Sequence, residues 1–206
     1  MENPNLTTIQ LDALREIGNI GAGHAATAIG QLIDKTVMID IPHVNFFSLD
    51  TVNTSDFFKE PKEISLAVYS KILGPLHGGA LVLFSKKDSL ILSEVLLQKK
   101  MGSEELLTVV DMSALSETSY ILCCSYLSAV GELLNMKQLI PSIPQVAVDN
   151  MDNLNKVLVK KFVGNDVSYV LSLENNILIE NITINLFVTL LLEQESVKKA
   201  LETLGL

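Results

Sequence analysis

Hydrophobic positions near the start of the chain repeat with the period of a helix. Between residues 8 and 33, at about 100° per residue, one side carries Leu14, Ile17, Gly21, Ala25, Ala28 and Leu32. The opposite side carries Asp12, Glu16, Asn19 and Gly23. Thr7 or Thr8 is suited to cap this segment, because a hydroxyl can accept a bond from a free helix N–H. The pattern predicts a long helix with one buried face and a short polar row.

The rest of the first half alternates in the manner of strands. Strand-like segments are residues 36–41, 44–49, 64–73 and 79–84. Pro42 lies between the first two and ends or bends a strand, because it cannot donate to a sheet ladder. Residues 51–63 look like a polar loop, and Asp88 or Ser89 begins a helix over 90–99.

The second half repeats this order. A shift of 101 residues aligns LDALREIGNI with MSALSETSYI, and places Glu16 on Glu117 and Gly30 on Gly131. Its predicted elements begin with a long helix over 113–134, strands over 137–140 and 145–148, and a helix over 150–162. Strands over 167–173 and 177–192 and a closing helix over 195–204 follow. The second of these strands has polar residues near Glu180 where it could be broken. We therefore expect an α/β (α+β) fold, in which a pseudo-twofold duplicated unit places antiparallel strands in a shared sheet with one long helix per half. Residues 1–206 would form one domain, with pseudo-repeats at about 8–100 and 109–206.

Composition narrows the classes of partner. The sequence has 15 Lys and Arg residues and 24 Asp and Glu residues, which gives a net charge of −9. This acidic balance argues against binding to nucleic acid or to anionic membranes, although the average sign does not describe a local site. No segment resembles a secretory signal or a membrane span. The two adjacent cysteines, Cys123 and Cys124, indicate buried thiols in a reducing cytoplasm rather than a disulfide or metal site.

The usual catalytic motifs are missing from the sequence. The segment GNIGAG, residues 18–23, differs in its glycine spacing from the dinucleotide-binding motif G-x-G-x-x-G, and it follows no strand. No P-loop, G-x-S-x-G or H-E-x-x-H motif occurs in the sequence. His24, His43 and His77 are far apart and more typical of structural or exposed positions. The polar row therefore remains, although such rows are most often simply solvated helix faces.

At this row the sequence resembles a known family. Asp12, Glu16, Asn19 and Pro42 stand at the spacing Asp/Ser-x3-Glu-x2-Asn-x22-Pro, within DALREIGNIGAGHAATAIGQL. This pattern is similar to that of the CheC-type phosphatases of bacterial chemotaxis, which include CheX and FliY. The resemblance extends over nearly the whole chain, and the family dephosphorylates the phosphorylated response regulator CheY.

The resemblance implies a role for each residue of the row. Asn19 would orient a water for in-line attack on the aspartyl phosphate, and Glu16 would pair with a lysine of the regulator. Gly23 would leave room for the regulator's backbone, and Asp12 would make a peripheral or capping contact. The chain would need no cofactor or metal of its own, because the regulator brings Mg²⁺.

The second half departs from the motif. Ser113 and Glu117 are present, but Tyr120 stands in place of the asparagine, and Ile143 in place of the proline. This half is therefore interpreted as inactive, with Glu117 as a docking contact or an ordinary surface glutamate.

The sequence is also compatible with other partners and functions. The resemblance also implies binding of the deamidase CheD, usually through the second half, for which residues 144–152, with Asp149 among them, and the helix after them are the candidate surface. The alternatives to a one-site phosphatase are a non-catalytic module that binds CheY or CheD, and a flagellar-switch phosphatase component.

Overall fold

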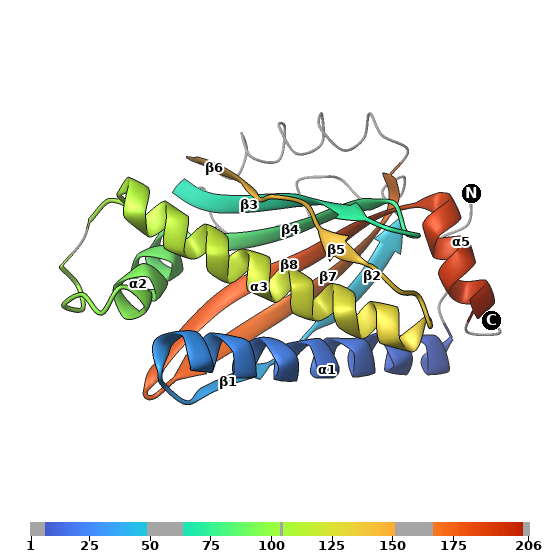
Figure 1. Ribbon diagram of the computed structural model, residues 1–206, viewed down its shortest axis with the longest axis horizontal. Coiled ribbons are helices and arrows are strands. Elements are labelled where there is room, and N and C mark those ends of the chain that lie inside the picture. Colours follow the sequence, from blue (N-terminus) through green and yellow to red (C-terminus); the bar gives the residue numbers. More distant parts are fainter. Residues whose placement is uncertain (1–6, 49–63, 104, 151–166, 204–206) are drawn as a thin grey trace.

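The computed structural model describes residues 7–48, 64–103, 105–150 and 167–203. One antiparallel sheet of eight strands forms its frame, with the order β1-β7-β8-β4-β3-β5; β2 also pairs with β7, and β6 with β3 (Figure 1). The strands are β1 Val37–Asp40, β2 Val44–Ser48, β3 Ile64–Leu73, β4 Gly78–Ser85, β5 Ile140–Pro141, β6 Gln145–Asn150, β7 Val167–Ile179 and β8 Ile182–Glu193. The helices are α1 Thr8–Ile33, α2 Lys86–Leu96, α3 Val109–Leu133 and α5 Gln194–Thr203.

The two halves interlock through the sheet. The short strands β1 and β2 of the first half pair with β7 of the second half, while β5 and β6 pair with β3 of the first. The two long hairpins, β3–β4 and β7–β8, meet where β4 pairs with β8, as in the Val82–Val188 pair. The predicted pseudo-twofold α/β fold with antiparallel strands in a shared sheet and one long helix per half is thereby confirmed.

Helices α1 and α3 lie side by side and antiparallel on one face of the sheet (Figure 1). Their close crossing centres on Gly21, where a Cβ would lie 2.5 Å from Cδ1 of Tyr126. Tyr126 is fully buried, and its hydroxyl donates to Oδ1 of Asn175 on β7. Burial raises the pKa of the Tyr126 hydroxyl well above its usual range. The absence of a side chain at Gly21 thus lets α1 pack closely against the ring of Tyr126 on α3, which is hydrogen-bonded to the sheet.

The main core fills the space between these helices and the sheet. Alternate strand residues face it, so Leu66 and Val68 of β3 join the main core while Ala67 and Tyr69 belong to a smaller cluster on the opposite face. Both faces of the central strands are therefore buried.

Matching capping boxes begin the two long helices. The Oγ1 atoms of Thr7 and Thr108 accept from the backbone N–H of Gln10 and Asp111, whose side chains accept the N–H of the capping threonine in return. These pairs stand 101 residues apart and extend the sequence repeat to the helix starts.

Several sequence expectations were wrong in detail. The second long helix begins at Val109 rather than Ser113, and α2 spans 86–96 rather than 90–99, because Ser85 accepts from the Asp88 N–H as its cap. The strand expected over 137–140 shortens to Ile140–Pro141. Leu32 is exposed, since Ile29 and Ile33 face the core instead. The expected loop over 51–63, and all of the expected helix over 150–162 except Asn150, lie outside the described residues.

The break considered near Glu180 is a hairpin turn. Residues 167–173 and 177–179 are parts of the single strand β7, and β8 follows the turn at Ile182.

Candidate functional site

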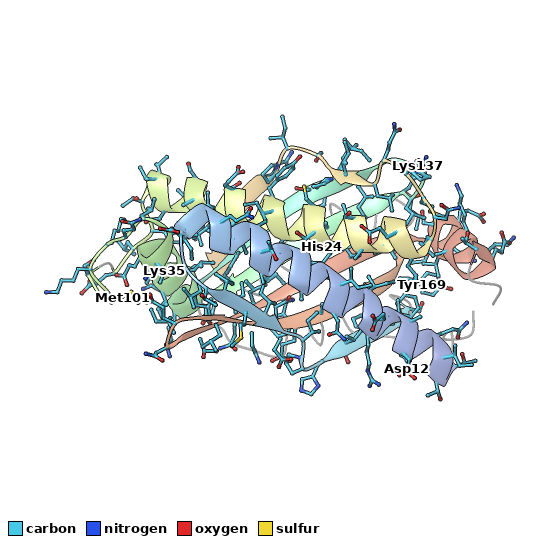
Figure 2. All side chains as sticks on the ribbon, turned by 60° about the horizontal axis from the view of Figure 1, so that its bottom comes forward. Asp12, His24, Lys35, Met101, Lys137 and Tyr169 are labelled. Carbon is cyan, nitrogen blue, oxygen red and sulfur yellow. The ribbon has the colours of Figure 1, made fainter. Side chains whose placement is uncertain are left out.

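The polar row occupies the outer face of α1. Asp12, Glu16, Asn19 and Gly23 are all exposed and follow one another at spacings of four, three and four residues. Residues at these spacings lie above one another on a helix surface. Figure 2 shows this side of the helix, with Asp12 near its first turns and His24 at its middle. The helix therefore presents two carboxylates, an amide and a stretch of backbone without a side chain in one line.

The inner face of the same turns fixes this line in place. Ile17, Gly21 and Ala25 are buried against α3 and the sheet. Gly18 lies beneath the row as well, where a Cβ would come within 3.1 Å of Ile41. Asn19 and Glu16 are thus held on a rigid support although their own side chains are in solvent.

Gly23 differs from the other described glycines of α1. A Cβ at Gly23 would meet nothing within 4 Å, whereas at Gly18, Gly21 and Gly30 it would meet another part of the chain. Glycine inside a helix costs about 1 kcal/mol relative to alanine. At Gly23 no contact within 4 Å accounts for that cost, and the backbone there is open to approach from outside the molecule.

Asp12 and Thr27 lie at the two ends of the row. Asp12 forms an exposed ion pair with Arg15, with 3.3 Å between Oδ1 and Nη1. Thr27 continues the row beyond Gly23, and its hydroxyl donates to the Gly23 carbonyl at 2.9 Å. Sequence analysis missed Thr27, although its spacing of four residues from Gly23 was a readable signal.

The corresponding face of α3 carries a different set of groups. Glu117 is exposed, but Tyr120 is half-buried, and its hydroxyl forms a hydrogen bond with the half-buried Cys124. The nearby Cys124 sulfur and the Glu117 charge raise the pKa of Tyr120. Burial likewise raises the pKa of the Cys124 thiol. A ring and a thiol therefore fill the positions that Asn19 and Gly23 occupy on α1.

The remaining sequence candidates lie on other elements than α1. Pro42 and His43 are exposed in the link between β1 and β2, and His77 is exposed beside the start of β4. Asp149 is exposed on β6, while residues 151 and 152 of the proposed CheD surface lie outside the described part of the chain.

The described residues contain neither a cluster of metal-ligand side chains nor a helix that could span a membrane. No three His, Cys, Asp or Glu side chains in the described part of the chain gather as metal ligands would. None of the helices described is both long and apolar enough to cross a membrane.

Comparisons with known proteins place the row in a family. Residues 9–45, which include the whole row and Pro42, match the model of the CheC-like family. The CheY-P phosphatase CheC of Bacillus subtilis is 34% identical over 143 residues, which cover 68% of this chain and 66% of the relative. The chain belongs to the CheC-like family.

Two further relatives extend this likeness. The flagellar motor switch phosphatase FliY of B. subtilis is 28% identical over 117 residues, or 56% of this chain, but the match spans only 30% of that protein. The chain thus spans just under two thirds of one curated relative's length and under a third of the other's. The crystal structure of Thermotoga maritima FliY has a TM-score of 0.78 at 23% identity and covers 98% of both chains, so this CheC-like chain shares its fold.

Proposed function

We propose that this protein hydrolyses the aspartyl phosphate of a phosphorylated CheY-type response regulator, with a single active face on α1. The observation that carries the proposal is the exposed line of Glu16, Asn19 and Gly23 on a helix whose inner face is fixed by packing. Membership of the CheC-like family, with relatives named as CheY-P phosphatases, supports the choice of substrate.

The carboxamide of Asn19 suits the reaction. It both accepts and donates hydrogen bonds, so it can hold a water beside the phosphorus atom, and it carries no charge that would repel the phosphoryl oxygens. Catalysis of phosphoryl transfer rests mainly on positioning and charge stabilisation. In our proposal the regulator binds the Mg²⁺, and this chain contributes the amide that orients the water.

Glu16 acts as the anchor of the complex. It stands one turn before Asn19 on the same face, and its exposed carboxylate is free to meet a lysine of the regulator. Gly23 receives the regulator's backbone one turn beyond Asn19, and Asp12 contributes at the rim. The three contacts would align the phosphoryl group with the amide between them.

The face on α3 lacks the amide and binds without hydrolysis in this proposal. The Tyr120 hydroxyl is engaged with Cys124, and its ring occupies the place of a short amide. The exposed Glu117 favours a second candidate function on this face: docking of CheY or of a CheD deamidase. A role as a flagellar-switch component is a further alternative that the FliY likeness leaves open.

Phosphate release from a phosphorylated CheY tests the main proposal. Asn19→Ala should lower the stimulated rate on the order of 10²-fold with little change in affinity, because the water is positioned only for the reaction. Gln31→Ala, another exposed amide on α1, is the matched control and should leave the rate unchanged. Turnover by Asn19→Ala equal to that of the control would exclude the role of Asn19.

Absence of stimulated release by the wild type, with regulator binding intact, would instead favour the non-catalytic module. Loss of CheY or CheD binding in Glu117→Ala would assign that partner to the α3 face.

A further inference from the structure

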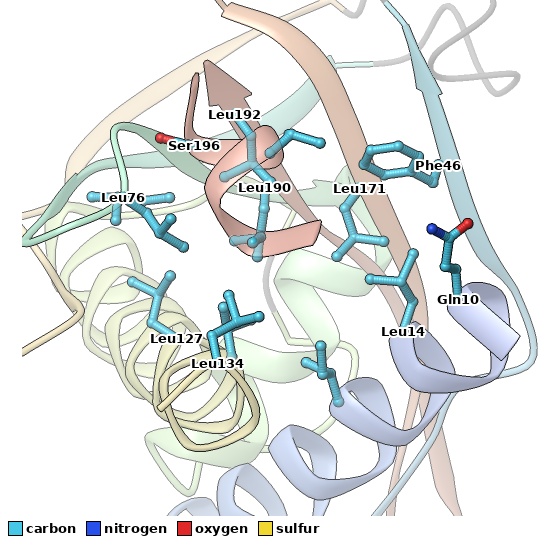
Figure 3. A pocket seen from close by; sticks show the side chains of 15 residues that line it. Gln10, Leu14, Phe46, Leu76, Leu127, Leu134, Leu171, Leu190, Leu192 and Ser196 are labelled. Carbon is cyan, nitrogen blue, oxygen red and sulfur yellow. The ribbon is translucent and has the colours of Figure 1, made fainter. Parts of the chain in front are cut away.

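A cavity of about 70 Å³ lies beneath α5, between the start of α1 and the end of α3. Aliphatic side chains from both helices and the sheet form its walls (Figure 3). They include Leu14, Leu127, Leu134, Leu171, Leu190 and Val197. The space is several times the roughly 10–15 Å³ that a single water needs.

The polar side chains at this cavity have partners elsewhere. The Ser196 hydroxyl accepts from the His77 N–H at 2.7 Å and donates to the His77 carbonyl at 3.2 Å. The Gln10 carbonyl oxygen accepts from the Thr7 N–H in the capping box of α1. A cavity walled by apolar atoms offers water too few partners, and such cavities stay dry and take up apolar guests.

At the opposite end of the molecule, buried leucines occupy the corresponding helix positions. Counted from the first residue of each helix, Ala200 of α5 corresponds to Leu92 of α2, and Leu14 of α1 corresponds to Leu115 of α3. Leu92 and Leu115 are fully buried, whereas Leu14 and Ala200 border the cavity and are only half-buried. One half of the duplicated fold thus closes its helix layer with a leucine, and the other leaves an alanine and a space.

We propose that this cavity is a binding site for a small, uncharged, apolar molecule, such as a short aliphatic chain, with α5 as its cover. Its walls supply almost entirely dispersion contacts, so a charged or strongly polar ligand would lose its hydration with little compensation. Its volume is roughly half that of an engineered cavity of about 150 Å³ that accepts benzene, which sets the size of the guest.

The site is distinct from the polar row and does not depend on the proposed phosphatase activity. Leu14 and Ile17 face the cavity from the inner side of α1, while Glu16 faces solvent from the turn that they share. A guest beneath α1 would therefore contact the support of the row and not the row itself.

Methyl NMR of the full chain under xenon pressure, and then with ethane, tests the proposal. Saturable shifts are expected for the methyl groups of Leu14, Leu127 and Leu190. The methyl groups of Leu92 and Leu115, at the filled equivalent place, serve as an internal control and should not shift. No shift at the cavity, or equal shifts at both ends, would overturn the proposal.

Substitutions on α5 provide a second test of the proposed cavity site. Ala200→Leu should abolish the xenon shifts and raise the melting temperature, because it fills the space as Leu92 does at the other end. Lys199→Leu adds the same side chain at an exposed position of α5 and should retain the shifts. Retained shifts in a folded Ala200→Leu would place the guest elsewhere; if that variant does not fold, the wild-type titration with its internal control still decides.

Discussion

At the scale of single residues, Gly21 and Gly23 have opposite reasons for lacking a side chain. At Gly21 the reason lies inside the molecule, where the Tyr126 ring occupies the space of a Cβ. At Gly23 the space is open. The sequence shows both as glycines of one run, and the packing of α1 on α3 separates a structural glycine from one that a partner could require.

Gly23→Ala tests that separation. The change should raise the free energy of unfolding by up to about 1 kcal/mol, since alanine favours the helix, and should weaken binding of the phosphorylated regulator. Urea denaturation and binding titration measure the two effects. Gly21→Ala is the matched control and should destabilise the fold. A Gly23→Ala variant with unchanged affinity would contradict the close approach of a partner.

Glu16→Gln tests the anchor. Removing the charge should weaken regulator binding by about 1 kcal/mol, or roughly fivefold, because exposed ion pairs contribute modestly. The loss should shrink as salt is raised, since screening already weakens the pair in the wild type. Asp12→Asn, at the rim of the row and already paired with Arg15, should have a smaller effect. Equal affinity of wild type and Glu16→Gln at low salt would exclude the lysine contact.

At the scale of elements, α3 begins earlier than its pattern of hydrophobic residues indicates. Val109 and Val110 are 74% and 61% exposed, so the apolar residues of the first turn do not mark the buried face. The start is set by Thr108 and by Asp111, which is fully buried and bonded to Lys99 at 2.7 Å. The sequence pattern placed the start at Ser113 because it could not show that Lys99 reaches Asp111.

Asp111 should make stability depend on acid pH. Burial by itself would raise its pKa, but Lys99 and the hydroxyl and N–H of Thr108 outweigh burial and lower the pKa from 3.8 to about 2. The carboxylate then contributes about 2 kcal/mol above about pH 4, and this is lost as the pH falls toward 2.

Urea denaturation between pH 2 and pH 6 measures this contribution. Asp111→Asn should be less stable at pH 6, and its free energy of unfolding should fall less steeply below pH 4. Asp40→Asn removes the same charge from an exposed strand position and provides the comparison. Parallel curves for the wild type and Asp111→Asn would refute the assignment.

At the scale of the whole molecule, the sheet makes the halves depend on each other. The short strands of each half pair only with the long hairpin of the other half among the described residues, and β4 meets β8 at the centre. Neither half can then complete its backbone hydrogen bonds or bury its hairpin alone.

The two halves should therefore fold only together. Residues 1–100 and 105–206, expressed separately, should give poorly dispersed amide NMR spectra and no cooperative unfolding transition. Mixing them should restore both, because the missing strand partners are then supplied in trans. A cooperatively folded isolated half would contradict the predicted single domain over 1–206.

The sequence by itself determined the long helix over 8–33, the duplication, and the polar row, because helical period and internal repeat are local properties that need no knowledge of neighbours. It also determined the contrast between Asn19 and Tyr120. Only the tertiary structure decided which half each short strand pairs with, why Gly23 differs from Gly21, and where an alanine leaves a cavity. Those outcomes depend on contacts between residues far apart in the chain, and a one-dimensional pattern does not record how two buried surfaces fit.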